Sequence, residues 1–188
     1  FTLDDVEPLQ AKVFHLGSLL ADDFSPEVVE ALADKGTVSI DAQGYLREVV
    51  GEEVRPVEWK DMSRVLRATG ILKLNESEMQ TVVGSNDPYE VGKKLAACGV
   101  DEVVMTLGSY GSVIYAGGKA YDIPAYKPKK LVDATGCGDT FSTGYLWCRV
   151  QGMGIEEAGK FAAAMCSLKL QHSGPFDGTI ADIEQLIG

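Results

Sequence analysis

Histidine and closely spaced cysteine are scarce in this chain of 188 residues. The two histidines, His15 and His172, lie far apart, and the four cysteines form no Cys-x-x-Cys pair. Zinc sites need several such ligands at short spacings, so these residues predict no zinc site. The sequence also contains no signal peptide and no apolar run long enough to span a membrane. We therefore expect a cytoplasmic protein whose cysteines are reduced thiols.

Positive charge is also in short supply. The chain has 17 Lys and Arg against 28 Asp and Glu, which gives a formal net charge of −11. Nucleic acids and anionic membrane surfaces bind basic faces, so we expect neither as a partner. The charge also opposes a phosphorylated ligand at long range, and such a site would need helix dipoles, a metal ion or local cations. Lys73, Lys127, Lys129 and Lys130 are available for this, although surface lysines are more often simply solvated.

Two common phosphate-binding motifs are absent. No Gly-x-x-x-x-Gly-Lys-Ser/Thr sequence occurs, which excludes a P-loop enzyme. Gly136 and Gly138 lack the third glycine of a dinucleotide-binding fingerprint, because Phe141 occupies its place.

What is present is an alternation of β-rich runs and helical patterns, in a chain with 45% hydrophobic residues. Strands are predicted over residues 12–16, 37–41, 71–74 and 102–107. Helices are predicted over residues 25–35, 58–69, 75 onward, 87–99, 140–150, 155–171 and 180–187. Ser25 as N-cap and Pro26 mark the start of the first helix, and Trp59 is expected on the apolar face of the second. Gly117-Gly118 between two further β-rich runs indicates a hairpin. The pattern predicts one α/β domain over residues 1–188, a three-layer α/β/α fold with a mainly parallel, Rossmann-like sheet and an antiparallel hairpin at one edge.

The segment 132–141, VDATGCGDTF, carries the strongest chemical signal. Gly136 and Gly138 let the backbone bend and approach a ligand, and the helix that follows directs its unpaired N–H groups to the same place. A carboxylate there would repel a phosphate unless it served the chemistry, so Asp139 is the candidate catalytic base. Taken alone, Gly-x-Gly-Asp at a helix start is more often structural.

The whole segment resembles the DTxGAGD signature of the ribokinase-like (PfkB) family of carbohydrate and nucleoside kinases. It departs from that signature at Ala134 and Cys137, both small residues. The resemblance implies phosphoryl transfer from MgATP to a hydroxyl of a sugar or nucleoside, with Asp139 as base. It further implies that the backbone N–H groups of Gly136, Cys137 and Gly138 stabilise the transferring group.

Two further segments are similar to family motifs. In Lys-Leu-Asn-Glu-Ser-Glu at 73–78, Asn75 and Glu78 match the Asn-x-x-Glu that organises Mg²⁺, although the pair is equally a good helix capping box. In Thr-Leu-Gly-Ser-Tyr-Gly at 106–111, the residues implied to bind nucleotide are Thr106, Gly108, Ser109 and Gly111.

Weaker matches complete the implied site. Arg47 follows a strand end that carries basic residues toward phosphates in several sugar kinases. His172 and Gly174 lie in a segment that resembles the boundary of the adenine pocket. Some relatives bind a monovalent cation such as K⁺ beside this loop, which would implicate Asp133 and Thr135.

Relatives are about half as long again, and no pattern typical of their lid precedes residue 12. The chain begins with Phe1, so we expect it to be the later portion of a kinase and inactive alone. The sequence leaves open a non-catalytic nucleotide-binding fragment and a vitamin-precursor kinase of the same superfold. A homodimer is compatible with each reading. At the helix N-terminus, Cys137 is expected to have a lowered pKa and to be the most reactive thiol.

Overall fold

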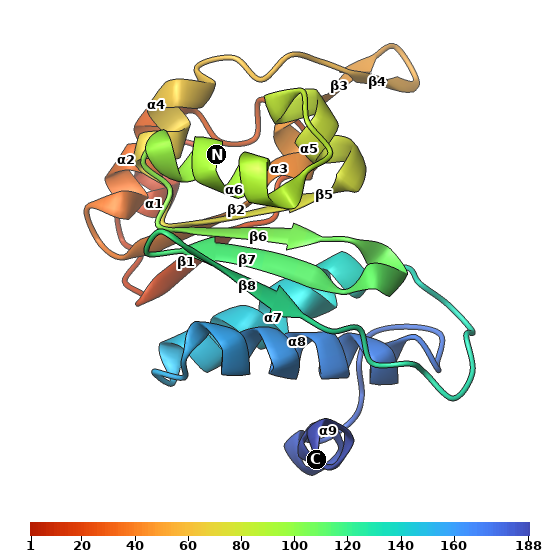
Figure 1. Cartoon of the computed structure of the whole chain (residues 1–188). Coiled ribbons are helices and arrows are strands. Elements are labelled where there is room, and N and C mark those ends of the chain that lie inside the picture. Colours follow the sequence, from red (N-terminus) through yellow and green to blue (C-terminus); the bar gives the residue numbers. More distant parts are fainter. The chain divides into compact units, whose positions relative to one another are not determined.

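The computed structural model describes residues 1–188 and contains two sheets (Figure 1). Six strands follow one another in the order β1-β2-β5-β6-β7-β8, and β3 pairs with β4 separately. Residue contacts divide the chain into two compact units. The first holds residues 1–105 and 115–119, and the second holds residues 106–114 and 120–188. The single domain expected from the sequence therefore stays a prediction.

Parallel strands form the centre of the first unit. Its strands are β1 (Val13–Leu16), β2 (Thr37–Asp41), β5 (Ile71–Asn75) and β6 (Glu102–Thr106). β1 pairs in parallel with β2, which places Leu16 opposite Ile40, and β2 pairs in parallel with β5, which places Asp41 opposite Lys73. These strands are rich in buried Val, Ile and Leu, as expected where parallel strands are covered by helices. The predicted parallel α/β arrangement is confirmed.

Helices of the first unit begin where the sequence places capping residues. They are α1 (Leu3–Val6), α2 (Pro26–Ala33), α3 (Ala42–Tyr45), α4 (Met62–Arg67), α5 (Glu76–Val83) and α6 (Pro88–Ala97). Before α2, the Ser25 hydroxyl accepts a hydrogen bond from the Val28 N–H at 3.4 Å, and Pro26 occupies the first position. Within this unit α5 and α6 lie over the same side of the strands (Figure 1).

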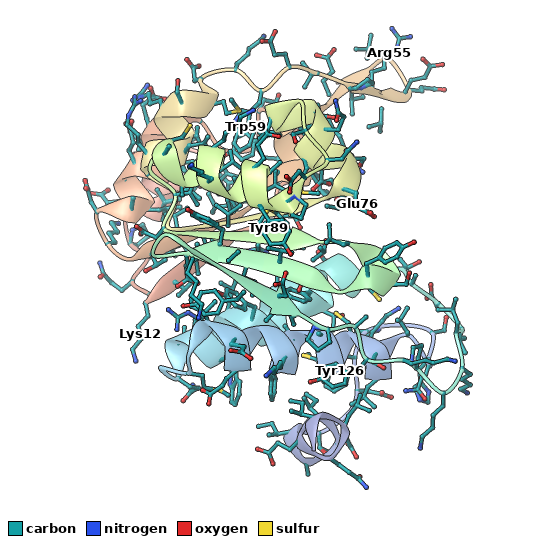
Figure 2. All side chains as sticks on the ribbon, viewed as in Figure 1. Lys12, Arg55, Trp59, Glu76, Tyr89 and Tyr126 are labelled. Atoms are coloured by element: carbon teal, nitrogen blue, oxygen red, sulfur yellow. The ribbon has the colours of Figure 1, made fainter.

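Helix α4 is shorter than the predicted helix over residues 58–69. Asp61 adopts a left-handed backbone with φ 53°, which starts the helix only at Met62. Trp59 consequently precedes the helix and does not lie on its apolar face. It is buried and stacks on Tyr45, with ring centroids 4.5 Å apart, among the helices of the first unit (Figure 2).

The first unit also contains a two-stranded ribbon that the sequence patterns did not predict. β3 (Arg47–Val50) and β4 (Glu53–Pro56) pair antiparallel around Gly51, which has φ 67°. All eight residues are exposed, including three valines, and Arg55 projects from the ribbon in Figure 2. Valines on both sides of a glycine were the available signal. Their charged neighbours give the segment a mixed pattern that obscured it.

The second unit consists mainly of helices. It contains the 3₁₀ turn η1 (Gly108–Tyr110) and the helices α7 (Cys137–Val150), α8 (Ile155–Lys169) and α9 (Ile180–Ile187). It also contains the first part of β7 (Ser112–Ala116) and most of β8 (Lys119–Ile123), while the turn between these strands belongs to the first unit. Between β7 and β8, Gly117 and Gly118 both have positive φ, as a two-residue hairpin turn requires, so the predicted hairpin is confirmed.

Helices α7 and α8 pack closely along their lengths. A Cβ atom at Gly144 would lie 3.2 Å from the Cα atom of Ala162, so small residues set this close approach. Trp147 of α7 also stacks on Phe161 of α8, with ring centroids 5.3 Å apart. Helix α9 packs on α8. None of the helices combines the length and apolar character needed to cross a bilayer.

A glycine substitution tests the packing of the loops after β1 and β2. A Cβ atom at Gly44 would lie 2.1 Å from the Ser18 hydroxyl oxygen and 2.3 Å from the Ser18 carbonyl oxygen. We expect Gly44→Ala to lower the free energy of unfolding by about 2 kcal/mol, because the backbone must move. The control Gly17→Ala meets only ordinary contacts and should change it by less than about 0.5 kcal/mol. Equal stability of the two variants in urea unfolding would refute the packing assignment.

Candidate active site

The loop before α7 enters the helix through a left-handed residue. Gly136 has φ 75° and is the N-cap of α7, which begins at Cys137, three residues earlier than the sequence predicts. Gly138 and Asp139 therefore lie in the first helical turn. Only glycine adopts this N-cap conformation without strain, so the residue fixes the direction in which the helix starts.

Two backbone N–H groups at this helix start have no acceptor. Cys137 donates its N–H to the Ala134 carbonyl at 3.2 Å, whereas the N–H groups of Gly138 and Asp139 find no partner in the protein. Thr140 donates both its N–H and its hydroxyl to the Gly136 carbonyl, at 2.9 and 2.8 Å. That carbonyl is thereby held in the helix, and the unpaired N–H groups form an anion site.

Asp139 lies at the edge of a pocket of about 480 Å³. Its carboxylate is exposed and is paired with no other side chain. A Cβ atom at Gly136 would lie 4.0 Å from its Oδ2 atom, so the carboxylate stands beside the left-handed residue. The lining residues are Asp133, Thr135, Gly136, Asp139, Thr140, Thr143, Met165, Lys169, Gly174, Pro175 and Phe176. A free carboxylate beside unpaired N–H groups can accept a proton next to a bound anion.

Asp133 is already engaged within the protein. Its Oδ1 accepts the Thr135 N–H at 2.9 Å, and its Oδ2 lies 3.7 Å from the ammonium of Lys169. The hydrogen bonds from Thr135, and then the Lys169 charge, lower the pKa of Asp133. The N–H of Asp133 donates to the Leu170 carbonyl at 3.3 Å. Asp133 thus fixes the loop to the end of α8.

In the first unit, Asn75 and Glu78 form a reciprocal capping box at the start of α5. The Glu78 carboxylate accepts the Asn75 N–H at 2.8 Å and the Asn75 side-chain amide at 2.6 Å. The Asn75 amide oxygen accepts the Glu78 N–H at 3.0 Å. Burial raises the pKa of Glu78, so ionising this carboxyl costs stability as the pH rises through that pKa.

Charged groups surround this capping box within the first unit. Lys73 and Asp41 form a buried ion pair at 2.5 Å. Lys73 is therefore not a solvated surface lysine, which is the more common role of such residues. The Glu78 pKa responds to the charges of Lys73 and Arg47. Arg47, which opens β3, lines with Glu78 and Ser77 a shallow pocket of about 300 Å³.

Asn75 and Glu78 could hold Mg²⁺ only through water molecules bound to the ion. No group of three His, Cys, Asp or Glu side chains in the structure could hold a metal ion directly. Each oxygen of the Glu78 carboxylate accepts one hydrogen bond from Asn75 and keeps a second lone pair. Mg²⁺ retains several waters and takes few protein ligands, so a hydrated ion fits this donor set.

The loop predicted to bind nucleotide has an exposed, glycine-shaped backbone. Gly108 and Ser109 form part of the exposed turn η1, and Thr106 ends the strand before it. Gly111 has φ 96°, and a Cβ atom there would lie 2.1 Å from the Ile123 carbonyl oxygen, so no other residue fits. His172 is exposed and lies outside the pocket lining, whereas Gly174 is part of it.

The structure brings the predicted residues together in two groups, one in each unit. Asp133, Thr135, Gly136, Asp139 and Gly174 line the pocket of the second unit, and Arg47 and Glu78 line that of the first. Sequence reasoning missed Lys169, which lines the first of these pockets although it is buried. A lysine in the last turn of an Ala-rich helix was the available signal.

The expected acidity of Cys137 is wrong. Burial raises its pKa, and Asp133 adds to the effect against the charge of Lys169. The helix N-terminus therefore does not produce a reactive thiolate here.

Comparisons with known proteins agree with this geometry. The sequence matches the pfkB family carbohydrate kinase description over residues 3–181. It is 30% identical to a nucleoside kinase of Methanocaldococcus jannaschii over 124 residues, which are 66% of this chain and 40% of that kinase.

Solved structures resemble this chain over nearly its whole length. A pyrophosphate-dependent kinase of the ribokinase family, complexed with a pyrophosphate analog and myo-inositol, superposes with a TM-score of 0.87 at 29% identity, covering 98% of this chain and 66% of that one. Ribokinase of Arabidopsis thaliana, complexed with ribose and ATP, has a TM-score of 0.77 at 26% identity, covering 99% of this chain and 59% of that one. The match therefore spans less than two thirds of each relative.

Thiol labelling tests the corrected view of the cysteines. Cys98 is exposed, whereas burial raises the pKa of Cys148 to about 11 and also raises that of Cys137. Since the thiolate is the reacting form, limited alkylation at neutral pH should modify Cys98 first. Peptide mapping measures the order, and labelling of Cys137 before Cys98 would show that the helix N-terminus outweighs burial.

Proposed function

Because the chain belongs to the PfkB family of carbohydrate kinases, we propose that the complete protein transfers a phosphoryl group from MgATP to a hydroxyl of a sugar or nucleoside. One observation carries the proposal. The unpaired Asp139 carboxylate stands in the same helical turn as two N–H groups that lack acceptors. This pairing of a proton acceptor with an anion site is what phosphoryl transfer needs.

In the proposed reaction, the acceptor hydroxyl attacks the terminal phosphorus and the bond to the ADP oxygen breaks. Asp139 orients the hydroxyl and accepts its proton. Of the three expected N–H donors to the transferring group, Gly136 and Gly138 are retained, and Asp139 is added. The third, Cys137, already donates its N–H to the Ala134 carbonyl. Asn75 with Glu78 would hold the water shell of Mg²⁺, which would supply positive charge to the donor phosphates.

Pyrophosphate is a second candidate for the phosphoryl donor. One similar structure is that of a pyrophosphate-dependent kinase. A helix N-terminus recognises the phosphates that ATP and pyrophosphate share, so the anion site suits both donors. We propose ATP because the exposed loop of Gly108, Ser109 and Gly111 and the segment of His172 and Gly174 supply surfaces beyond the phosphates. Activity with pyrophosphate but not with ATP would reverse this choice.

The acceptor follows from the family rather than from a contact in this chain. Similar proteins include a nucleoside kinase and a ribokinase solved with ribose. Two alternatives are a vitamin-precursor kinase and a non-catalytic nucleotide-binding fragment. Calorimetric titration with ATP, followed by a phosphorylation screen, separates them. Nucleotide binding without turnover of any acceptor by the complete protein would favour a non-catalytic role.

Location and assembly belong to the same proposal. All four cysteines are free, which suits a cytoplasmic enzyme. The family resemblance also implies a monovalent cation that involves Asp133 and Thr135, although the Asp133 carboxylate already lies 3.7 Å from the Lys169 ammonium. We retain a homodimer, because an isolated two-stranded ribbon with exposed Val49, Val50 and Val54 is more stable when covered.

Substitution of the proposed base tests the function directly. In the complete enzyme, Asp139→Asn should lower kcat by roughly 10²-fold or more, because it removes the proton acceptor and keeps the shape. Donor affinity should stay nearly unchanged. The control Asp177→Asn removes another exposed carboxylate of the second unit and should leave kcat at the wild-type value. A kcat near wild type in Asp139→Asn would remove Asp139 from the chemistry.

The metal role of the capping box has its own test. If Glu78 holds the water shell of Mg²⁺, Glu78→Gln should raise the Mg²⁺ concentration needed for half-maximal activity of the complete enzyme. The control Glu76→Gln changes an exposed carboxylate in the same helical turn (Figure 2) and should not alter the requirement. An unchanged Mg²⁺ requirement in Glu78→Gln would leave Asn75 and Glu78 as a helix cap only.

A further inference from the structure

A buried lysine lies against the signature loop in the second unit. Lys169 ends helix α8 and is 2% exposed. Its ammonium donates to the backbone carbonyl of Asp133 at 3.0 Å and lies 3.7 Å from the Asp133 carboxylate. Lys169 also lines the pocket that contains Asp139. A positive charge is therefore fixed next to the proposed anion site, in a protein whose net charge is negative.

The burial of this ammonium is costly unless its partners compensate. A carbonyl and a carboxylate of one residue meet it, and its position in the last turn of α8 adds the negative end of that helix dipole. By contrast, the side chain of Lys160 on the same helix is 37% exposed and forms an ion pair with Glu156, one turn away. The environment of Lys169 is thus that of an internal counterion and not that of a solvated surface charge.

The same contacts determine whether a monovalent cation fits beside the loop. Such a cation would need the oxygens of Asp133. One carboxylate oxygen of Asp133 accepts the Thr135 N–H. The other accepts the Ser173 hydroxyl at 3.5 Å and lies 3.7 Å from the Lys169 ammonium, which also binds the Asp133 carbonyl. A second positive charge at these oxygens would be repelled by that ammonium, which is itself buried. The residues present therefore do not fit a monovalent cation at Asp133 and Thr135.

We propose that the Lys169 ammonium takes the place of a monovalent cation, so that this protein positions its signature loop without K⁺. The ammonium ties the carbonyl of Asp133 to the end of α8, where the N–H groups of Val132 and Asp133 also donate to the Leu170 carbonyl. These bonds fix the residues that lead into Gly136. Lys169 acts as a positioning residue, because it holds the loop and touches no reacting atom.

Thermal unfolding of the 188-residue chain tests this independently of catalysis. Wild-type protein should have the same Tm in potassium chloride and in tetramethylammonium chloride at equal concentration, since no site awaits K⁺. Lys169→Met removes the charge and keeps a similar length, so it should lower Tm. Potassium should then restore about 3 °C that tetramethylammonium does not, because binding to the vacated place stabilises the folded state.

The same Tm measurement supplies the control and the result that would overturn the proposal. Lys160→Met, which removes a partly exposed lysine of the same helix, should show no selective response to K⁺. A wild-type Tm that rises selectively with K⁺ would overturn the proposal, because it would reveal a cation site despite Lys169. That comparison needs no variant, so it stands even if Lys169→Met fails to fold.

A second readout rests on the proposed kinase function. In the complete enzyme, K⁺ should leave wild-type kcat unchanged and should raise the kcat of Lys169→Met several-fold. Stimulation of the wild type by K⁺ would contradict the proposal. If the protein has no kinase activity at all, the proposed function fails, while the Tm comparison still decides the role of Lys169.

Discussion

The left-handed backbone of Gly136 is the constraint on which the proposed site depends. With φ 75° at this N-cap, helix α7 starts at Cys137 and leaves the N–H groups of Gly138 and Asp139 without acceptors. A side chain at Gly136 would strain this conformation, and a different start would rotate the first turn. The same turn carries the Asp139 carboxylate. Anion site and base are therefore products of one backbone geometry.

The loop that delivers Gly136 is held by groups behind it. Asp133 accepts the Thr135 N–H, and the buried Lys169 ammonium holds the Asp133 carbonyl. The Lys169 ammonium is buried, so removing the Asp133 groups that meet it would leave a buried charge without compensation. We infer that the buried charge of Lys169 serves to keep the loop before Gly136 rigid. Phosphoryl transfer relies on fixed dipoles more than on covalent chemistry, so a rigid loop favours it.

Local sequence signals predicted much of the fold because each rests on a nearby physical cause. Ser25 with Pro26 marked the start of α2, and Gly117-Gly118 marked the hairpin, since caps and tight turns are decided within a few residues. Prediction failed where distant contacts decide. The left-handed Asp61 shortened α4, and Trp59 packs on Tyr45, which lies far from it in the sequence.

In the candidate site, too, local contacts were predictable from the sequence and distant contacts were not. The signature and the capping box of Asn75 and Glu78 were predictable, because their partners lie three or four residues apart. Lys169 was not, since its partner Asp133 is 36 residues away. The pKa of Cys137 was misjudged because the helix dipole can be inferred from sequence, whereas burial cannot.

The central claim is that backbone N–H groups at the start of α7 bind the phosphates of the donor. Amide chemical shifts of the ¹⁵N-labelled chain, followed by NMR during titration with Mg²⁺ and a non-hydrolysable ATP analogue, measure this directly. We expect the amide resonances of Gly138 and Asp139 to move most, while the amide of Cys137, already bonded to Ala134, moves less. Saturable binding that shifts other amides and leaves Gly138 and Asp139 unchanged would contradict the account.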